Sequence, residues 1–168
     1  VPASVAPRVA RSLLNPEIKN RDMQVPFVYQ RQIHWGETDA AGIVYTGQFL
    51  DFMLEAVECW WREVVGLDWY KMNTELSMGT PMVSTHIDFK APVYDGDLLD
   101  LSVTVEHLGG ASIKHFITGR GPDGSERFEG SLTGAIVNNK IMKAVRIPDD
   151  WRQTIEAYQA ACKSAANK

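Results

Sequence analysis

The sequence predicts an α+β protein in which one long apolar helix packs against an antiparallel sheet. Three observations lead to this prediction. A helical period from Gln48 to Val65 is apolar around most of its circumference, so that helix must be buried on most sides. A period of two residues begins after Pro81 and continues through four or so strands. A second helical segment follows Pro148. The order of strand, long helix, strands and terminal helix is typical of α+β folds.

The first strand is expected from Val25 to Trp35, because Phe27, Tyr29, Ile33 and Trp35 alternate on one face. It leads into a glycine-punctuated loop, Glu37 to Gly47, which holds one central carboxylate, Asp39. The long helix follows this loop directly. A helix N-terminus presents unpaired N–H groups and a partial positive charge, which suit an oxyanion. A carboxylate beside such a terminus predicts acyl chemistry.

The long helix has one narrow polar stripe, and the remaining elements are bounded by clear turn signals. The stripe consists of Gln48, Asp51, Glu55, Glu58 and Arg62. Gly66 is the expected end of the helix, and a short helix or turn pair is expected over 67–76. The later strands are expected at 82–90, 99–106, 111–119 and 125–138, and the C-terminal helix from Pro148 to about Ala161.

Length, charge and cysteine content restrict the classes of protein to consider. A chain of 168 residues suits one domain, here residues 25–168 after an N-terminal arm, residues 1–24. The formal net charge of −4 argues against nucleic-acid and anionic-membrane partners. Cys59 and Cys162 lie far apart in the sequence, which favours a reducing compartment and a cytoplasmic location. No apolar run approaches the ~18 residues of a membrane span.

Three stretches of the sequence together carry a resemblance to a known family. The first is Asp39-Ala40-Ala41-Gly42-Ile43-Val44-Tyr45, which has the pattern D-x-x-G-[IV]-V-[YW]. The second runs from Pro81 through Phe89 to Asp97, and the third is Val145-Arg146-Ile147-Pro148. In these stretches the sequence resembles the hotdog-fold thioesterases, in the 4-hydroxybenzoyl-CoA thioesterase-like branch, and the resemblance covers about Val25 to Ala161.

This resemblance implies a fold, an assembly and an activity. The fold is a long central helix wrapped by a five- to six-stranded antiparallel sheet, with a C-terminal helix. The assembly is a homodimer or homotetramer with active sites at the subunit interface. The activity is hydrolysis of an acyl- or aroyl-CoA thioester to the free acid and CoA, without a metal or an organic cofactor.

The resemblance also assigns roles by position. Asp39 matches the catalytic aspartate, which acts as nucleophile on the thioester carbonyl or as base for water. Thr46 matches the residue whose backbone N–H polarises the thioester oxygen at the helix start, a contact typically worth ~10²–10³ in rate. The positions expected to contact the substrate are Tyr45, Gly47, Leu54 and His86.

Three departures from the branch bear on the substrate. Leu54 stands where the hydroxybenzoyl-specific members have a carboxylate, which favours a more apolar acyl group. Thr46 stands where some relatives have a histidine. The segment Leu108 to Ala111 replaces a turn that carries basic residues for the CoA phosphates. Phosphate contacts would then come from Lys90, Lys114 or Arg120, unless the acyl carrier is not CoA.

Several alternatives stay open at this point. Glu55 is a second candidate nucleophile, because another hotdog branch uses a helix glutamate, although a solvated or interface role suits the polar stripe better. His34 is expected to be packed or hydrogen-bonded. A non-hydrolytic hotdog module that binds an acyl-thioester or aromatic ligand is the main rival, and a hotdog hydratase the weaker one. The sequence has no metal-ligand spacing and no G-x-S-x-G elbow.

Overall fold

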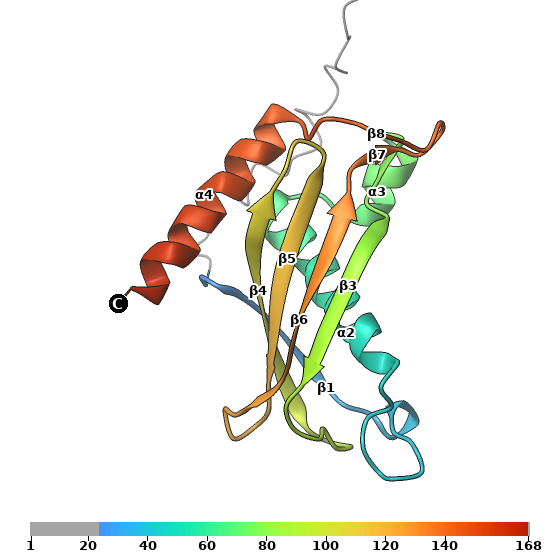
Figure 1. The fold of residues 1–168 in the computed structure, drawn as a ribbon, viewed down its shortest axis with the longest axis vertical. Helices are drawn as coiled ribbons and strands as arrows, with labels where there is room; N and C mark the ends of the chain where they lie inside the picture. Colours follow the sequence, from blue (N-terminus) through green and yellow to red (C-terminus); the bar gives the residue numbers. More distant parts are fainter. Residues whose placement is uncertain (1–23, 168) are drawn as a thin grey trace, which may run out of the picture.

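The computed structural model describes residues 24–167, so the predicted N-terminal arm lies outside the described residues except for Gln24. The elements follow the predicted order (Figure 1). They are β1 (Phe27–Gln32), η2 (Trp35–Glu37), α2 (Gln48–Trp60), η3 (Trp61–Val65), α3 (Trp69–Thr74), β2 (Met78–Gly79), β3 (Met82–Phe89), β4 (Leu98–Leu108), β5 (Ser112–Arg120), β6 (Glu126–Ala135), β7 (Val137–Asn138), β8 (Lys143–Ala144) and α4 (Asp149–Ala166).

A five-stranded antiparallel sheet of order β1-β4-β5-β6-β3 forms the centre of the molecule. Figure 1 shows α2 lying across one face of this sheet and α4 running beside β4. A smaller sheet, β2-β7-β8, lies next to α3 at one end. The predicted α+β hotdog architecture is therefore confirmed, with the main sheet at five strands.

The core lies between α2 and the sheet, as the two sequence periods predict. The buried side chains of α2 are Phe49, Phe52, Met53, Ala56, Val57 and Trp60. On β4 the alternating apolar positions are buried as well, namely Leu99, Leu101, Val103 and Val105. The helix thus buries its apolar face against the inward-pointing side chains of the strands. In its polar stripe Asp51 and Arg62 are exposed, whereas Glu55 is half-buried and faces β1.

The long helix ends with a wider turn. A π-helical turn, η3, follows α2 without a break, and the left-handed residue Gly66 terminates it. The predicted extent of the helix, Gln48 to Val65, is confirmed. The short helix α3 falls inside the predicted 67–76 segment.

Three predicted boundaries were wrong. The strand expected at 125–138 is divided into β6, which ends at Ala135, and β7, which pairs with β2 and β8 in the smaller sheet. The first strand ends at Gln32 rather than Trp35, because the chain turns into η2 once the Ile33 N–H has bonded to the Asp97 carbonyl at 2.8 Å. Trp35 is consequently 74% exposed instead of core-facing. The C-terminal helix continues to Ala166, where alanine and lysine residues favour helix and Cys162 still packs against the core.

No helix among the described residues is long and apolar enough to cross a membrane.

Candidate active site

The loop that carries Asp39 is closed by backbone hydrogen bonds at its base. Thr38 and Val44 form an antiparallel bridge, and the Asp39 N–H donates to the Ile43 carbonyl at 2.9 Å. Gly42, with φ of 76°, turns the chain so that its N–H donates to the Asp39 carbonyl at 2.9 Å. The sequence predicted a glycine-dependent loop here, and its backbone conformation is largely determined by these internal bonds.

The Asp39 carboxylate is exposed and only partly engaged. Its Oδ1 accepts a hydrogen bond from the Ala41 N–H at 2.8 Å, the usual geometry of an Asx turn. Within residues 24–167 its second oxygen accepts no hydrogen bond. One oxygen therefore orients the side chain, and the other is available to a substrate or a water molecule.

The start of α2 offers free backbone donors next to this loop. The first helical bonds run from the Gln48 N–H to the Tyr45 carbonyl at 2.9 Å and from the Phe49 N–H to the Thr46 carbonyl at 3.4 Å. The N–H groups of Thr46 and Gly47 donate no hydrogen bond within the described part of the chain. Both groups carry the partial positive charge of a helix N-terminus.

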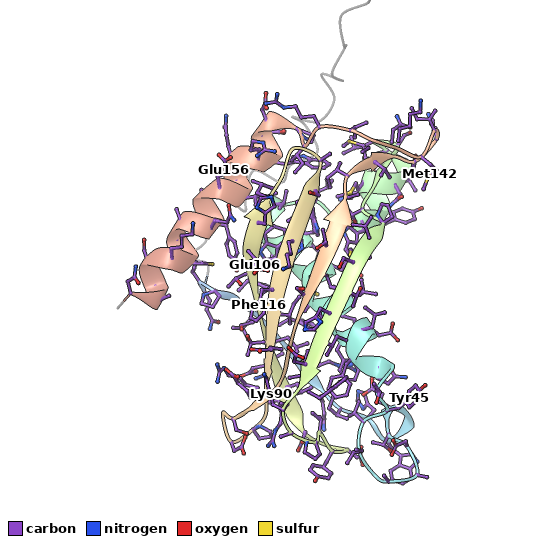
Figure 2. The ribbon with its side chains drawn as sticks, viewed as in Figure 1. Tyr45, Lys90, Glu106, Phe116, Met142 and Glu156 are labelled. Carbon is purple, nitrogen blue, oxygen red and sulfur yellow. The ribbon has the colours of Figure 1, made fainter. Side chains whose placement is uncertain are left out.

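Gly47 leaves room for the Tyr45 ring that lies against it. A Cβ added at Gly47 would come within 2.6 Å of Cε1 of Tyr45, a separation that real Cβ contacts do not reach. Tyr45 itself is 58% exposed and labelled at the lower end of the molecule in Figure 2. Two of the predicted substrate-contacting positions are thus neighbours beside the free N–H groups.

The loop is also attached to the segment after β3. The Val44 N–H donates to the Val93 carbonyl at 2.9 Å, and Ile43 and Tyr94 form a bridge. Val44 and Val93 are both buried. The loop is therefore held against the end of the sheet by packing as well as by hydrogen bonds.

Leu54, half-buried on α2, lines a cavity of about 360 Å³. The other lining residues come from α3, from β2, β3 and the segment between them, and from β7 and the turn after it: Trp69, Asn73, Gly79, Thr80, Pro81, Met82, Val137, Asn139 and Met142. Figure 2 labels Met142 and Tyr45 at opposite ends of the molecule. The cavity therefore extends from the middle of α2 away from the Asp39 loop.

His86 lies on the other face of the sheet from α2. Its cross-strand partner is Ser131, whereas Ile87 is paired with Gly130, and a Cβ at Gly130 would meet the Met53 side chain of α2. Since neighbouring strand residues point to opposite faces, His86 points away from the helix. Its Nε2 lies 3.0 Å from an oxygen of Asp88, and the side chain is exposed. The structure does not bring His86 together with Asp39.

The three basic residues suggested for the CoA phosphates are each paired with a glutamate. Their pairs are Lys90–Glu129 at 2.9 Å, Lys114–Glu106 at 2.7 Å and Arg120–Glu126 at 2.7 Å. The hydrogen bond to Glu129 raises the pKa of Lys90. Lys114 and Arg120 are six residues apart on β5, about 20 Å, so the three do not form one cluster. Lys90 lies at the same end of the molecule as Tyr45 (Figure 2).

A largely buried charged group beside the loop was not identified from the sequence. Arg31, on the helix-facing side of β1, is paired with Glu37 and lies 3.6 Å from the Glu55 carboxylate. Glu55 also accepts a hydrogen bond from the Tyr29 hydroxyl at 3.4 Å, and burial together with the Glu55 charge raises the pKa of Tyr29. The available signal was the arginine that interrupts the apolar alternation of the first strand.

The groups at the site indicate the chemistry that it can perform. Across residues 24–167, no three His, Cys, Asp or Glu side chains gather where they could hold a metal ion. The site presents a carboxylate, free helix N-terminal donors and an adjoining apolar surface. Those groups can polarise a carbonyl and activate a nucleophile.

Two of the curated proteins that are similar to this chain carry the same name. The chain is 37% identical over 82 residues to a 1,4-dihydroxy-2-naphthoyl-CoA hydrolase of Synechocystis, covering 47% of this chain and 56% of that protein. It is 40% identical over 81 residues to the Picosynechococcus protein of the same name, covering 48% and 54%. The chain thus spans little more than half the length of these curated relatives.

Solved structures match over more of the chain. A thioesterase-superfamily protein from Jannaschia sp. CCS1 has a TM-score of 0.75 and 33% identity, covering 80% of this chain and 93% of that one. A 1,4-dihydroxy-2-naphthoyl-CoA thioesterase from Synechocystis has a TM-score of 0.71 and 25% identity, covering 77% and 94%. The model of the thioesterase-like superfamily matches residues 33–155. The resemblance noted in the sequence is thereby confirmed, and the chain belongs to the thioesterase-like superfamily.

Proposed function

We propose that this protein is an acyl-CoA thioesterase that hydrolyses an acyl- or aroyl-CoA thioester to the free acid and CoA. The observation that carries the proposal is the free N–H of Thr46 at the start of α2, next to the loop that presents Asp39. The relatives named as 1,4-dihydroxy-2-naphthoyl-CoA hydrolases support the same reaction.

In the proposed reaction the thioester oxygen accepts a hydrogen bond from the Thr46 N–H, with Gly47 beside it. Negative charge that develops on this oxygen is stabilised by the helix N-terminus, which typically contributes ~10²–10³ in rate. Asp39 either removes a proton from the attacking water or attacks the carbonyl itself and forms an anhydride that water then opens. In both cases the C–S bond breaks, the CoA thiolate leaves and takes up a proton, and the acid is released.

The acyl group is proposed to lie along α2 towards Leu54 and the cavity that it lines. A helical side chain leans towards the helix N-terminus, so Leu54 covers the turn between its own position and the loop. An apolar side chain there favours an apolar acyl or aroyl group over one with a charged or strongly polar end. Lys90 and Arg120 both lie at the loop end of the molecule, because Arg120 is paired with Glu126 while the Lys90 N–H donates to the carbonyl of the next residue, Arg127. Lys90 is the phosphate contact to be tested, and it would exchange Glu129 for the phosphate.

The proposal is tested by measuring thiol release from a panel of thioesters with the wild type and with Asp39→Asn. The panel contains 1,4-dihydroxy-2-naphthoyl-CoA, 4-hydroxybenzoyl-CoA, straight-chain acyl-CoAs and the pantetheine thioesters of the same acids. We expect Asp39→Asn to lower kcat by ~10²–10⁴. The matched control is Asp123→Asn, because Asp123 makes the same kind of Asx turn with the Ser125 N–H at 3.1 Å, in the β5–β6 hairpin.

Each outcome has a defined meaning. Full activity of Asp39→Asn would refute the role of Asp39. Tight binding of the thioesters without turnover would favour the non-hydrolytic hotdog module instead. A phosphate contact from Lys90 would be refuted if CoA and pantetheine thioesters of the same acid have equal KM values with the wild type, and also with Lys90→Gln. The acyl group with the highest kcat/KM identifies the substrate class.

A further inference from the structure

Arg31 occupies an unusual place for a charged residue, on the helix-facing side of β1, with a side chain that is only 9% exposed. Its guanidinium carbon lies 3.8 Å from the centre of the Phe52 ring of α2. One Nη is paired with Glu37, and Nε faces Glu55 at 3.6 Å. The guanidinium therefore contacts η2, which precedes the Asp39 loop, and α2, which follows it.

Glu37 is the residue through which this contact reaches the loop. Its Oε1 accepts from Arg31, and its Oε2 accepts from the His34 N–H at 2.8 Å. Its backbone carbonyl accepts from the Tyr45 N–H at 2.9 Å. Both carboxylate oxygens of Glu37 and its backbone carbonyl thus accept hydrogen bonds at the start of the loop.

The two ends of the loop are joined at this point. Asp39 lies two residues after Glu37, and Thr46 directly follows Tyr45. A shift of Glu37 would therefore displace the carboxylate and the oxyanion donor relative to each other. Catalytic geometry is sensitive to such shifts, since a misplacement of about 1 Å can cost ~10² in rate.

We propose that Arg31 is a positioning residue of this active site, which holds Glu37 and thereby sets the relative position of Asp39 and the Thr46 N–H. The inference rests on the proposed thioesterase function. It also gives Glu55 a role other than nucleophile, because its Oε2 faces Arg31 and accepts from the Tyr29 hydroxyl.

The energetics favour positioning over simple stabilisation. A buried ion pair adds little net stability, because desolvation offsets the attraction. Within the described residues the Nη1 of Arg31 is buried without a hydrogen-bond partner, so the guanidinium is not fully satisfied in this place. A planar group that stacks on a ring and holds two carboxylates is nevertheless well suited to fix directions, which a lysine cannot do.

The test compares Arg31→Lys, Arg31→Met and Glu37→Gln with the wild type in kcat, KM and amide hydrogen exchange. We expect kcat to fall ~10–100-fold in Arg31→Met with KM changed less than about twofold, since the substrate contacts stay in place. Arg31→Lys should recover only part of the loss. Exchange should become faster in peptides covering residues 38–46 but not in peptides from β5 and β6.

Arg127→Met is the matched control. Arg127 is also largely buried, is paired with Asp123 at 3.1 Å and has a buried nitrogen without a partner among the described residues, but it lies in the β5–β6 hairpin. We expect the Arg127→Met variant to have a lower free energy of unfolding than the wild type and an unchanged kcat.

The proposal would be overturned by variants of Arg31 that lose stability while kcat stays unchanged, as is expected for Arg127→Met, or by variants in which the hydrogen exchange of the loop is unchanged. Arg31→Lys and Glu37→Gln keep the size and polarity of the side chains, so the same measurements are made on these two variants if Arg31→Met does not fold. Absence of turnover in the wild type would refute the thioesterase proposal alone, because the exchange measurement still tests the contact between Arg31 and the loop.

Discussion

His115 on β5 is a buried histidine without a polar partner. It is 2% exposed, and within residues 24–167 neither ring nitrogen makes a hydrogen bond. Its ring meets the Trp60 ring edge-to-face at 4.7 Å between centroids. Burial lowers the pKa of His115 from 6.5 to about 3, so the folded protein keeps this ring neutral under most conditions.

This environment predicts a specific dependence of stability on pH. Between pH 6.5 and about 3 the unfolded chain protonates His115 and the folded chain does not, so the free energy of unfolding falls as the pH is lowered through this range. The contribution is at most about 1.4 kcal/mol per pH unit. His115→Phe should remove it and should leave stability at pH 7 equal or higher, because no hydrogen bond to the ring is lost.

Urea unfolding at pH 7, 6 and 5 measures the effect of His115→Phe. His107→Phe, at an exposed position on β4, is the control and should keep the wild-type pH dependence. An unchanged pH dependence in His115→Phe would show that its ring is solvated in the folded protein.

Among the elements, α4 illustrates how a surface helix is attached to a sheet. Three of its side chains bond to backbone groups of the sheet region: Arg152 to the Gly109 carbonyl, Gln159 to the Val105 carbonyl, and Tyr158 to two groups. The Tyr158 hydroxyl accepts from the Phe27 N–H at 2.9 Å and donates to the Val103 carbonyl. Burial raises the pKa of Tyr158, so the hydroxyl remains a donor.

Tyr158→Phe should lower the free energy of unfolding by about 1–3 kcal/mol, because it leaves two backbone groups of β1 and β4 without this partner. Thermal or urea unfolding checks the value. Tyr70→Phe, at a tyrosine that is 76% exposed, should change stability by less than about 0.5 kcal/mol. Equal effects of the two substitutions would mean that the Tyr158 hydroxyl adds nothing to the attachment of α4.

At the scale of the whole molecule, β3 leaves one side of the main sheet open. It pairs with β6 and forms the end of the strand order. Two apolar residues on it are strongly exposed, Val83 at 62% and Phe89 at 50%. Open apolar edge strands pair readily with another chain. We therefore propose that a second copy of the protein covers β3, in a homodimer or homotetramer.

Val83→Lys should weaken this assembly, because a lysine on an edge strand opposes pairing. Sedimentation velocity is expected to show an oligomer for the wild type and a larger monomer fraction for Val83→Lys, with thioesterase activity falling in parallel. Ile141→Lys is the control, since Ile141 is equally exposed, at 62%, but lies in the turn between β7 and β8. A wild type that is monomeric and fully active would refute the proposed assembly.

The elements of the fold could be predicted largely from local patterns, whereas the long helix wrapped by a sheet was expected from the resemblance to the hotdog thioesterases. The largely apolar helix that begins at Gln48, the alternation along β4 and the turn signals between the strands depend on short-range periodicity, which tertiary contacts reinforced. The error at Trp35 came from the same reasoning, because the alternation continued past the residue at which the chain left the sheet.

The candidate site was predictable only in part. The Asp39 loop and its position before the helix follow from adjacent residues, and the roles of Asp39 and Thr46 stay predictions. The surroundings of the other suggested residues depend on strand pairing. The pairing decides to which face of the sheet His86 points and which glutamate lies beside Lys90, Lys114 and Arg120.

The sequence by itself determined the α+β class, the long buried helix, the glycine-dependent Asp39 loop and the likeness to thioesterases, because each is encoded in neighbouring residues. Only the tertiary structure decided that Arg31 joins Glu37 to Glu55, and that Phe27 and Tyr158, 131 residues apart, share a hydrogen bond. Such partners belong to different elements. Their distance and burial are set by how those elements pack, which no local pattern of residues specifies.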